Sequence, residues 1–164
     1  MNDHARRMYN HAMEYINDAN ILQGRLDSIS NASAIIRVLA FEILLKCAIY
    51  LNNGKLLKGH NYDTLWEKLS TEAKEEIEKT AQERMPAQVD LSNIPNLLKE
   101  LTDVFMDGRY LYEKNEGMTR EEVKIKGQSW VHRGAPLEEA DIQYFPEELE
   151  CLICGLKSHI ESKI

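Results

Sequence analysis

Residues 31–51 are apolar almost all the way round a predicted helix. At helical spacing one side carries Ile35 and Leu39, while Phe41 and Leu45 fall on other sides. A helix that is apolar on every side has to be covered on every side, so it belongs in the middle of a helical bundle. This segment constrains the fold more than any other part of the chain.

Apolar residues also recur three and four positions apart in other segments, which predicts further helices. Gly54 suits the end of the 31–51 helix, Pro86 ends a polar helix that begins at Thr71 and is expected outside the core, and Pro95 and Pro146 suit first turns. The expected long helices cover residues 3–25, 31–51, 94–112 and a segment from 146, with a short helix at 62–69. We predict an all-α fold, an up-down bundle of four long helices plus one or two short ones, in a single domain of residues 1–164.

The segment from about 115 to 145 shows weak periodicity. It holds three glycines and Pro136, and only residues 123–125 suggest a short strand, for which the chain offers no partner. We therefore expect a long loop, which a compact domain of this size seldom keeps without a function.

Charge is unevenly distributed along the chain, whose formal net charge is −7. Residues 1–60 hold seven Lys or Arg against five Asp or Glu, and residues 61–164 hold thirteen against twenty-two. A protein that coats nucleic acid without sequence preference needs a basic stripe on its surface. The acidic balance of this chain argues against such a protein, but it leaves room for a small local basic site.

The three cysteines predict buried or nearly buried thiols and no cofactor. Cys47 lies in the apolar helix, and Cys151 and Cys154 form a single C-x-x-C with no second pair to complete a metal site. The N-terminus has no apolar core of a signal peptide, and no apolar run reaches the length of about 18 residues that a membrane span needs. We expect a cytoplasmic protein with reduced thiols, no bound metal and no membrane association.

Three short motifs carry a family resemblance. They are a Glu42-Ile-Leu-Leu-Lys46 core on the apolar helix, the Asn53-Gly54 break, and His60-Asn-Tyr-Asp-Thr-Leu65 leading into a short helix. Together they resemble the HEPN (higher eukaryote and prokaryote nucleotide-binding) domain. The resemblance implies a HEPN-like helical bundle, a homodimer, a link to nucleotides or RNA, a possible nucleotidyltransferase partner, and a toxin-antitoxin or defence setting.

Many HEPN proteins are metal-independent ribonucleases that use an Arg and a His four to six residues apart. The matching position here is Arg109, with Lys114 where the family has His. Histidine can move a proton at neutral pH and arginine can hold a phosphate through two hydrogen bonds. An Arg-x4-His spacing also occurs at Arg6 with His11 on the first helix, where a solvent-exposed or dimer-facing surface is the alternative.

The candidate site residues come from the end of the third long helix and from the 115–145 segment. Arg109 and His132 are the candidate catalytic pair. Aromatic rings that stack on bases and cations that hold phosphates extend the candidate nucleotide or RNA site. That candidate binding set is Arg109, Tyr110, Tyr112, Lys114, Trp130 and Arg133. The alternative is that Trp130 only pins the loop and leaves His132 at the surface.

Three further groups have a structural interpretation beside the functional one. Glu42 and Lys46 are one helical turn apart, so they form either an ion pair or the exposed edge of a groove. Arg109 and Glu113 have the same spacing, so they form either an ion pair or part of a polar pocket. His60 is either a packed, hydrogen-bonded histidine or a base.

Three functions remain open on the sequence. The first is a non-catalytic, dimeric HEPN-like binding or regulatory module, favoured because Lys114 stands in place of the family's His. The second is a HEPN ribonuclease whose Arg-x4-6-His motif departs from the family pattern. The third is a helical bundle that binds a small molecule.

Overall fold

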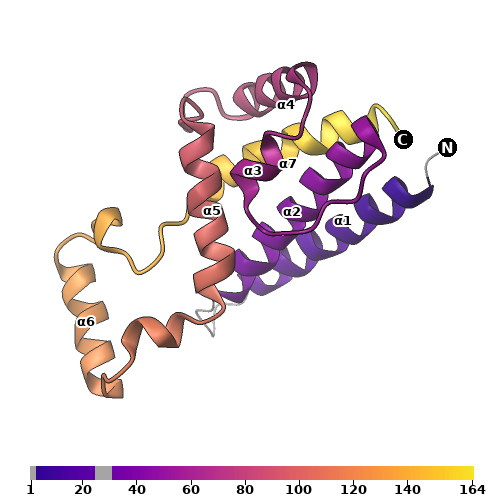
Figure 1. The fold of residues 1–164 in the computed structure, drawn as a ribbon. Helices are drawn as coiled ribbons and strands as arrows, with labels where there is room; N and C mark the ends of the chain where they lie inside the picture. The colour runs from indigo at the N-terminus through magenta and orange to yellow at the C-terminus, as the bar shows by residue number, and fades with distance from the viewer. Residues whose placement is uncertain (1–2, 25–30) are drawn as a thin grey trace.

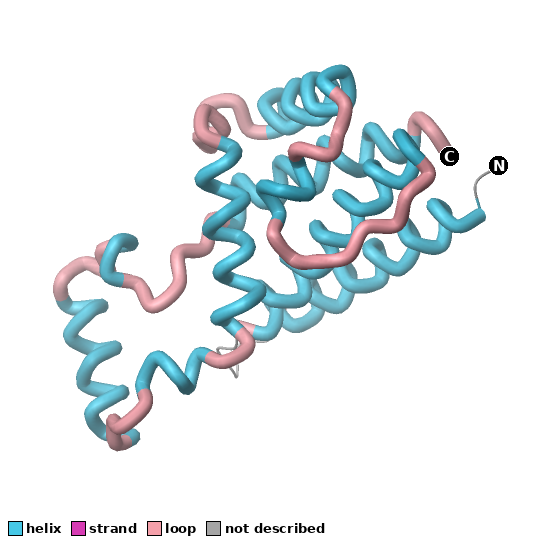
Figure 2. The backbone as a smooth tube through the Cα atoms, in the orientation of Figure 1, coloured by secondary structure: helices cyan, strands magenta, loops and turns pink. Residues whose placement is uncertain are grey.

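The computed structural model describes residues 3–24 and 31–164, which form seven α-helices, two 3₁₀ helices and no strand (Figures 1 and 2). The prediction of an all-α fold is therefore confirmed. The predicted end of the first helix near Arg25 lies outside the described residues. In chain order the elements are α1 (Asp3–Gln23), α2 (Ala32–Asn53), α3 (Tyr62–Trp66), α4 (Thr71–Arg84), α5 (Ile94–Gly108), η1 (Leu111–Asn115), α6 (Arg120–His132), η2 (Leu137–Glu139) and α7 (Pro146–Glu161).

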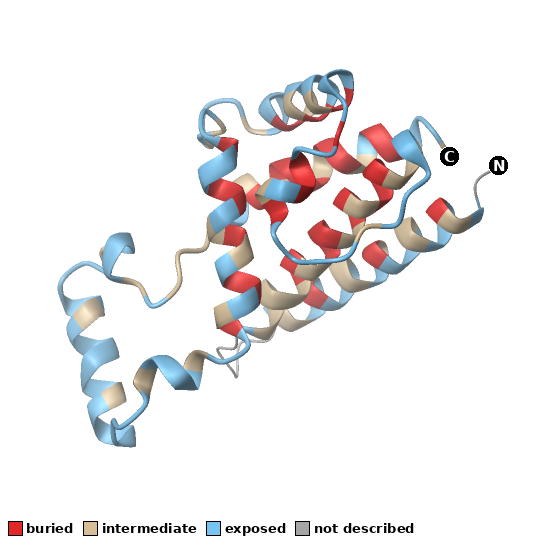
Figure 3. Ribbon diagram, viewed as in Figure 1, coloured by how far each residue is buried: buried red, intermediate tan, exposed pale blue. Residues whose placement is uncertain are grey.

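Helix α2 lies at the centre of the bundle, as its sequence predicts. It contacts α1, α3, α5 and α7, and ten of its residues are buried (Figure 3). Helix α1 packs along α2 through Ala5, Ala12 and Ala19, whose small side chains let the two helices approach closely. Gly54 ends α2 in the left-handed conformation, with φ of 69°, and its N–H donates to the carbonyl of Tyr50.

Helix α4 belongs to the core, so the prediction that it lies outside was wrong. It packs on α7 and buries Ala73, Ile77 and Ala81 although most of its residues are polar. The two helices approach so closely at Gly155 that a Cβ there would lie 2.4 Å from the carbonyl oxygen of Ile77. Three apolar residues on one face are enough to fix this contact, and the polar residues on the rest of the helix hide this face in the sequence.

Helix α5 is shorter than predicted. Asn93 caps its first turn through the N–H of Asn96, and Pro95 occupies the expected position there. The helix ends at Gly108 instead of continuing through Tyr112, and the chain then forms the 3₁₀ helix η1. A Cβ on Gly108 would lie 3.4 Å from Ile35, at van der Waals contact, so α5 passes close to the start of α2 here.

Residues 111–139, here called the arm, stand away from the bundle (Figures 1 and 3). The prediction of a long loop was wrong, because residues 120–132, which include the strand-like segment 123–125, form α6. Thr119 and Glu122 form a reciprocal capping box at its start. This pair is a helix-start signal in the sequence, but the prediction followed the weak apolar periodicity of the segment instead. No residue of η1, α6 or η2 is buried.

The cysteines lie where the sequence places them. Cys47 and Cys151 are buried, Cys154 is half-buried, and all three are free thiols. Burial raises the pKa of the Cys47 thiol to about 11, and its thiol donates to the carbonyl of Ala5. No helix in the described ranges is long and apolar enough to cross a membrane.

Candidate functional site

A buried carboxylate organises a cluster of polar and aromatic side chains where α2, α3 and α5 meet. The side chain of Glu42 is 5% exposed and accepts hydrogen bonds from Lys46 Nζ at 2.8 Å and His60 Nδ1 at 2.9 Å. The predicted Glu42–Lys46 ion pair is thus confirmed, and His60 is a hydrogen-bonded histidine. Lys46 lies one turn further along α2, and His60 ends the loop that joins α2 to α3.

Tyr62 forms the floor of this cluster. Its side chain is fully buried and packs edge-on against Phe41, with ring centroids 5.7 Å apart. Its hydroxyl makes no hydrogen bond of standard geometry within the described residues. Burial, followed by the nearby charge of Glu42, raises the pKa of Tyr62 well above its usual range, while the charge of Arg109 acts in the opposite direction.

The ring of Phe105 carries two basic side chains at the surface of the cluster. The His60 ring lies with its centroid 4.9 Å from that of Phe105, and the Arg109 guanidinium carbon lies 4.5 Å from the same centroid. Arg109 also lies 5.3 Å from the Tyr110 ring. A guanidinium over an aromatic face is held in place while its N–H groups remain free for other partners. We call Glu42, Lys46, His60, Tyr62, Phe105 and Arg109 the Glu42 cluster.

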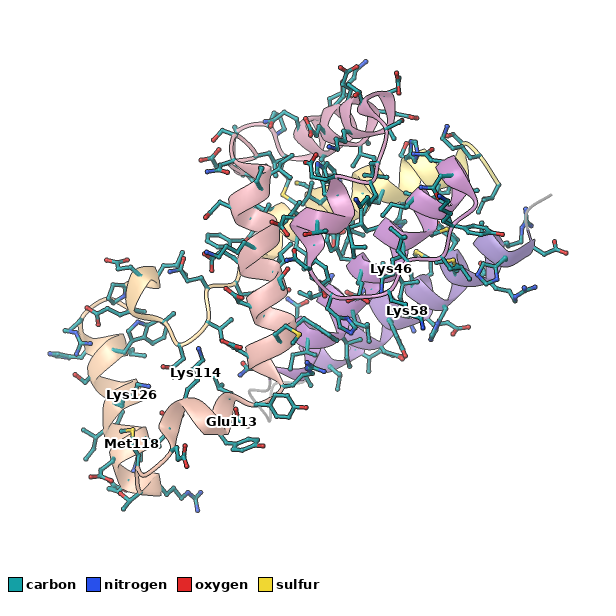
Figure 4. All side chains as sticks on the ribbon, viewed as in Figure 1. Lys46, Lys58, Glu113, Lys114, Met118 and Lys126 are labelled. Carbon is teal, nitrogen blue, oxygen red and sulfur yellow. The ribbon has the colours of Figure 1, made fainter. Side chains whose placement is uncertain are left out.

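Arg109 is the free cation of the Glu42 cluster. It is exposed, and within residues 3–24 and 31–164 it makes no salt bridge, its single polar contact being with the sulfur of Met106 at 3.4 Å. Lys46, by contrast, is neutralised by Glu42. Lys58 is exposed two residues before His60, and Figure 4 shows it with Lys46 on the face that the α2–α3 loop crosses.

The geometry of His60 resembles that of a general base. Its Nδ1 faces the Glu42 carboxylate, so the neutral ring carries the proton on Nδ1 and leaves the lone pair of Nε2 directed away from Glu42. The side chain is 47% exposed, which makes Nε2 accessible to a ligand. A carboxylate that orients a histidine in this way stabilises the protonated ring that forms when Nε2 takes up a proton.

Of the predicted site residues, Arg109 belongs to the Glu42 cluster and Tyr110 borders it. Tyr110 and Tyr112 are exposed, and their rings meet edge-to-face with centroids 6.3 Å apart. The predicted Arg109–Glu113 relation depends on a continuous helix and was wrong, because α5 ends at Gly108 and the two residues do not share a helical face.

The remaining predicted residues lie on the arm. Lys114 pairs with Asp107 at 2.8 Å, and this hydrogen bond raises the pKa of the lysine. Trp130 is half-buried and donates from Nε1 to the carbonyl of Pro136, so it pins the end of the arm. Arg133 pairs with Glu139.

His132 is exposed at the end of α6, and the described contacts do not join it to Arg109. The predicted catalytic pair is therefore not assembled within one chain. On α1, Arg6 donates to the carbonyl of Ile164, and the exposed His11 ring lies tilted against that of Tyr15. These contacts agree with the surface alternative for the Arg6–His11 motif.

A cleft of about 530 Å³ separates the arm from the bundle. Ile35, Val104 and Ile142 line its bundle side, and Val123 and Trp130 line its arm side. The charged residues along its edge are already paired with one another, Lys126 with Asp141 and Arg133 with Glu139. The cleft thus offers apolar surface and few free polar groups.

Comparison with known proteins gives no relative: no protein-family model, no curated protein and no solved structure matches the chain. Nor do the described residues contain a group of three or more His, Cys, Asp or Glu arranged to hold a metal ion. Functional inference therefore rests on the geometry of the site.

Sequence reasoning did not join His60 to Arg109. The two residues are 49 positions apart, and only the packing of the α2–α3 loop against α5 brings both onto Phe105. The available signal was that Glu42, Lys46 and His60 all lie in the motifs of the family resemblance. Lys58 carried no signal beyond its charge.

Proposed function

We propose that the protein is a non-catalytic, dimeric binding module with a HEPN-like bundle, in which the Glu42 cluster holds the phosphate of a nucleotide or RNA. The observation that carries the proposal is the guanidinium of Arg109, which makes no salt bridge within the described residues and lies over Phe105 beside His60. A fixed arginine with free N–H groups is suited to a phosphate. In this proposal α1, α2, α5 and α7 are the four long helices of the bundle, and a nucleotidyltransferase is a candidate partner.

The buried carboxylate gives the site its order. Glu42 fixes His60 and Lys46 through two hydrogen bonds, so the ring that neighbours Arg109 has one orientation. Tyr110 and Tyr112 add exposed aromatic faces next to Arg109 on which a base can stack. Because the chain is acidic overall, binding is confined to this local group of cations.

The test is the affinity for a short fluorescent RNA, measured by anisotropy. Arg109→Ala is expected to weaken binding by about tenfold or more, since a charge-assisted contact with a phosphate contributes roughly 1.5–3 kcal/mol. Arg84→Ala is the matched control, because Arg84 is an exposed arginine in the last turn of α4. Equal losses for the two variants would refute the site.

The second candidate function is metal-independent RNA cleavage, favoured by the Glu42–His60 pair beside Arg109. In that reaction His60 Nε2 takes the proton of a ribose 2′-hydroxyl, the oxygen attacks the phosphorus, and the 5′-oxygen leaves with a proton from water to give a 2′,3′-cyclic phosphate. Cleavage in the presence of a chelator that His60→Ala abolishes and His132→Ala preserves would support it. If the folded protein cleaves no RNA, cleavage is ruled out and only the binding function remains.

A further inference from the structure

The cleft between the arm and the bundle has two apolar walls, and only one of them belongs to the core. On the bundle side, Ile35 and Ile142 line the cleft and pack against the hydrophobic core. On the arm side, Val123 and Trp130 line it and are half-buried, but among the described residues they lie outside that core. Protein interiors are packed about as densely as organic crystals, so facing apolar walls normally meet. Here they leave a space of about 530 Å³.

Polar contacts at the rim give the arm side of the cleft a defined shape. Lys126 Nζ donates to Asp141 Oδ1 at 2.7 Å and to Asn115 Oδ1 at 3.2 Å, so it ties α6 to η1 and to the segment that returns to the bundle. Trp130 Nε1 donates to the carbonyl of Pro136 at 2.9 Å. This bond fixes one edge of the indole, and the ring lines the cleft as a flat apolar surface.

The charged side chains that line the cleft neutralise one another. Lys126 pairs with Asp141, and Arg133 pairs with Glu139. No other charged residue lines the cleft in the described part of the chain. A charged ligand would lose hydration water on entry without finding a free partner of opposite charge, and that loss is costly. The cleft therefore suits an uncharged molecule.

We propose that the cleft binds an uncharged, mostly apolar small molecule, with a planar ring of the ligand packed on Trp130. Ligand sites typically have volumes of about 300–1,000 Å³, mostly apolar walls and few polar groups, and the cleft has these properties. The ligand joins the arm wall to the bundle wall. It thereby covers Val123 and Trp130 and supplies the apolar contact that α6, with no buried residue of its own, lacks among the described residues.

The cleft is separate from the Glu42 cluster, although both use α5. Val104 and Gly108 line the cleft, whereas Phe105 and Arg109 belong to the cluster. Successive residues of a helix are about 100° apart around its axis, so Val104 and Phe105 lie on different faces of α5. The inference therefore goes beyond the proposed function and does not depend on it.

The test compares two fluorescent dyes that share the same rings. Phenylnaphthylamine is uncharged, and anilinonaphthalene sulfonate carries one negative charge. We expect phenylnaphthylamine to bind saturably, and to bind about tenfold or more tightly than the sulfonate, because the sulfonate group finds no free cation in the cleft. Sulfonate binding that is as tight or tighter would overturn the assignment of an uncharged ligand.

Val123→Phe and Val131→Phe form a matched pair of variants on α6. Val123 lines the cleft, whereas Val131 does not and is 64% exposed. The larger side chain at position 123 fills part of the cleft, so it is expected to raise the dissociation constant of phenylnaphthylamine by about tenfold or more. The same change at position 131 is expected to alter it by less than about twofold. Circular dichroism on the same samples reports whether each variant remains folded.

Hydrogen exchange locates the dye without any substitution, so it decides the question if Val123→Phe disturbs the arm. The amides of α6 lie in a helix with no buried residue and are expected to exchange rapidly in the free protein. Phenylnaphthylamine in the cleft packs on α6 and is expected to slow this exchange several-fold. The slowing should exceed that in α4, none of whose residues lines the cleft.

The outcomes separate this inference from the proposed function. The absence of saturable phenylnaphthylamine binding at about 100 µM protein overturns the inference. Equal effects of Val123→Phe and Val131→Phe, or α6 amides that exchange no more slowly with the dye, place the dye elsewhere and also overturn it. None of these results changes the expected dependence of RNA affinity on Arg109, which has its own test.

Discussion

Removal of the Glu42 carboxylate tests whether this buried charge organises the functional cluster. In Glu42→Leu the shape of the side chain is roughly kept, while Lys46 and His60 lose the acceptor that they share at 2.8 and 2.9 Å. Lys46 is then left as an unpaired ammonium group whose side chain is only 16% exposed. The Tyr62 hydroxyl loses its neighbouring carboxylate as well.

The expected loss follows from the burial of these partners. Breaking a fully buried ion pair from one side costs about 3–5 kcal/mol. His60 is half-exposed and Lys46 can reach water in part, so we expect about 2–3 kcal/mol of unfolding free energy. For a chain of this size that corresponds to a drop of roughly 4–12 °C in the thermal midpoint.

The assay is chemical denaturation of a double-mutant cycle that adds Lys46→Met. Because the second change removes the unpaired charge, the double variant is expected to recover most of the loss. A single variant within about 0.5 kcal/mol of wild type would refute the argument, since surface substitutions fall in that range. A double variant as unstable as the single one would show that packing, rather than charge, explains the effect.

Three further predictions follow from the packing, the capping and the thiol. Gly155→Ala places a methyl group against the backbone of α4 and is expected to lower the unfolding free energy by about 1–3 kcal/mol in urea denaturation, whereas no loss would show that α4 does not pack tightly on α7 there. Thr119→Ala removes the capping box, so amides of α6 are expected to exchange with solvent several-fold faster while the thermal midpoint of the bundle stays constant. Burial raises the pKa of the Cys47 thiol to about 11. The folded state therefore keeps a proton that the thiol of the unfolded chain loses near about pH 8.5. Stability therefore falls from about pH 9 to pH 11, and a Cys47→Ala variant with the same slope would contradict this cause.

The helices that carry a strong apolar pattern, on one side or all round, were predictable from the sequence. Helix α2 was placed within two residues at each end, because its apolar run stops at Asn53 and Gly54. Helix α6 was missed because its few apolar residues face two different surfaces and Gly127 interrupts them. Pattern reasoning detects helix faces that pack on a core, and none of the residues of α6 is buried in the described part of the chain.

The candidate site was predictable only in part. Arg109 was identified through its motif position and its chemistry. Its neighbour His60 was identified as a motif residue but not as a partner, because their proximity depends on how the α2–α3 loop folds across Phe105. His132 was paired with Arg109 only because the two side chains have suitable chemistry. It lies at the end of α6, which is separated from α5 (Figure 1).

The most direct test of the central claim is the salt dependence of RNA binding. Arg109 and Lys58 supply two cations, so the plot of log affinity against log salt is expected to have a slope of about −1.4 for single-stranded RNA. Arg109→Ala should make that slope shallower by about 0.7, and Arg84→Ala should leave it unchanged. Wild-type protein that binds no RNA, or a slope that Arg109→Ala does not alter, would contradict the assignment of the Glu42 cluster as a phosphate site.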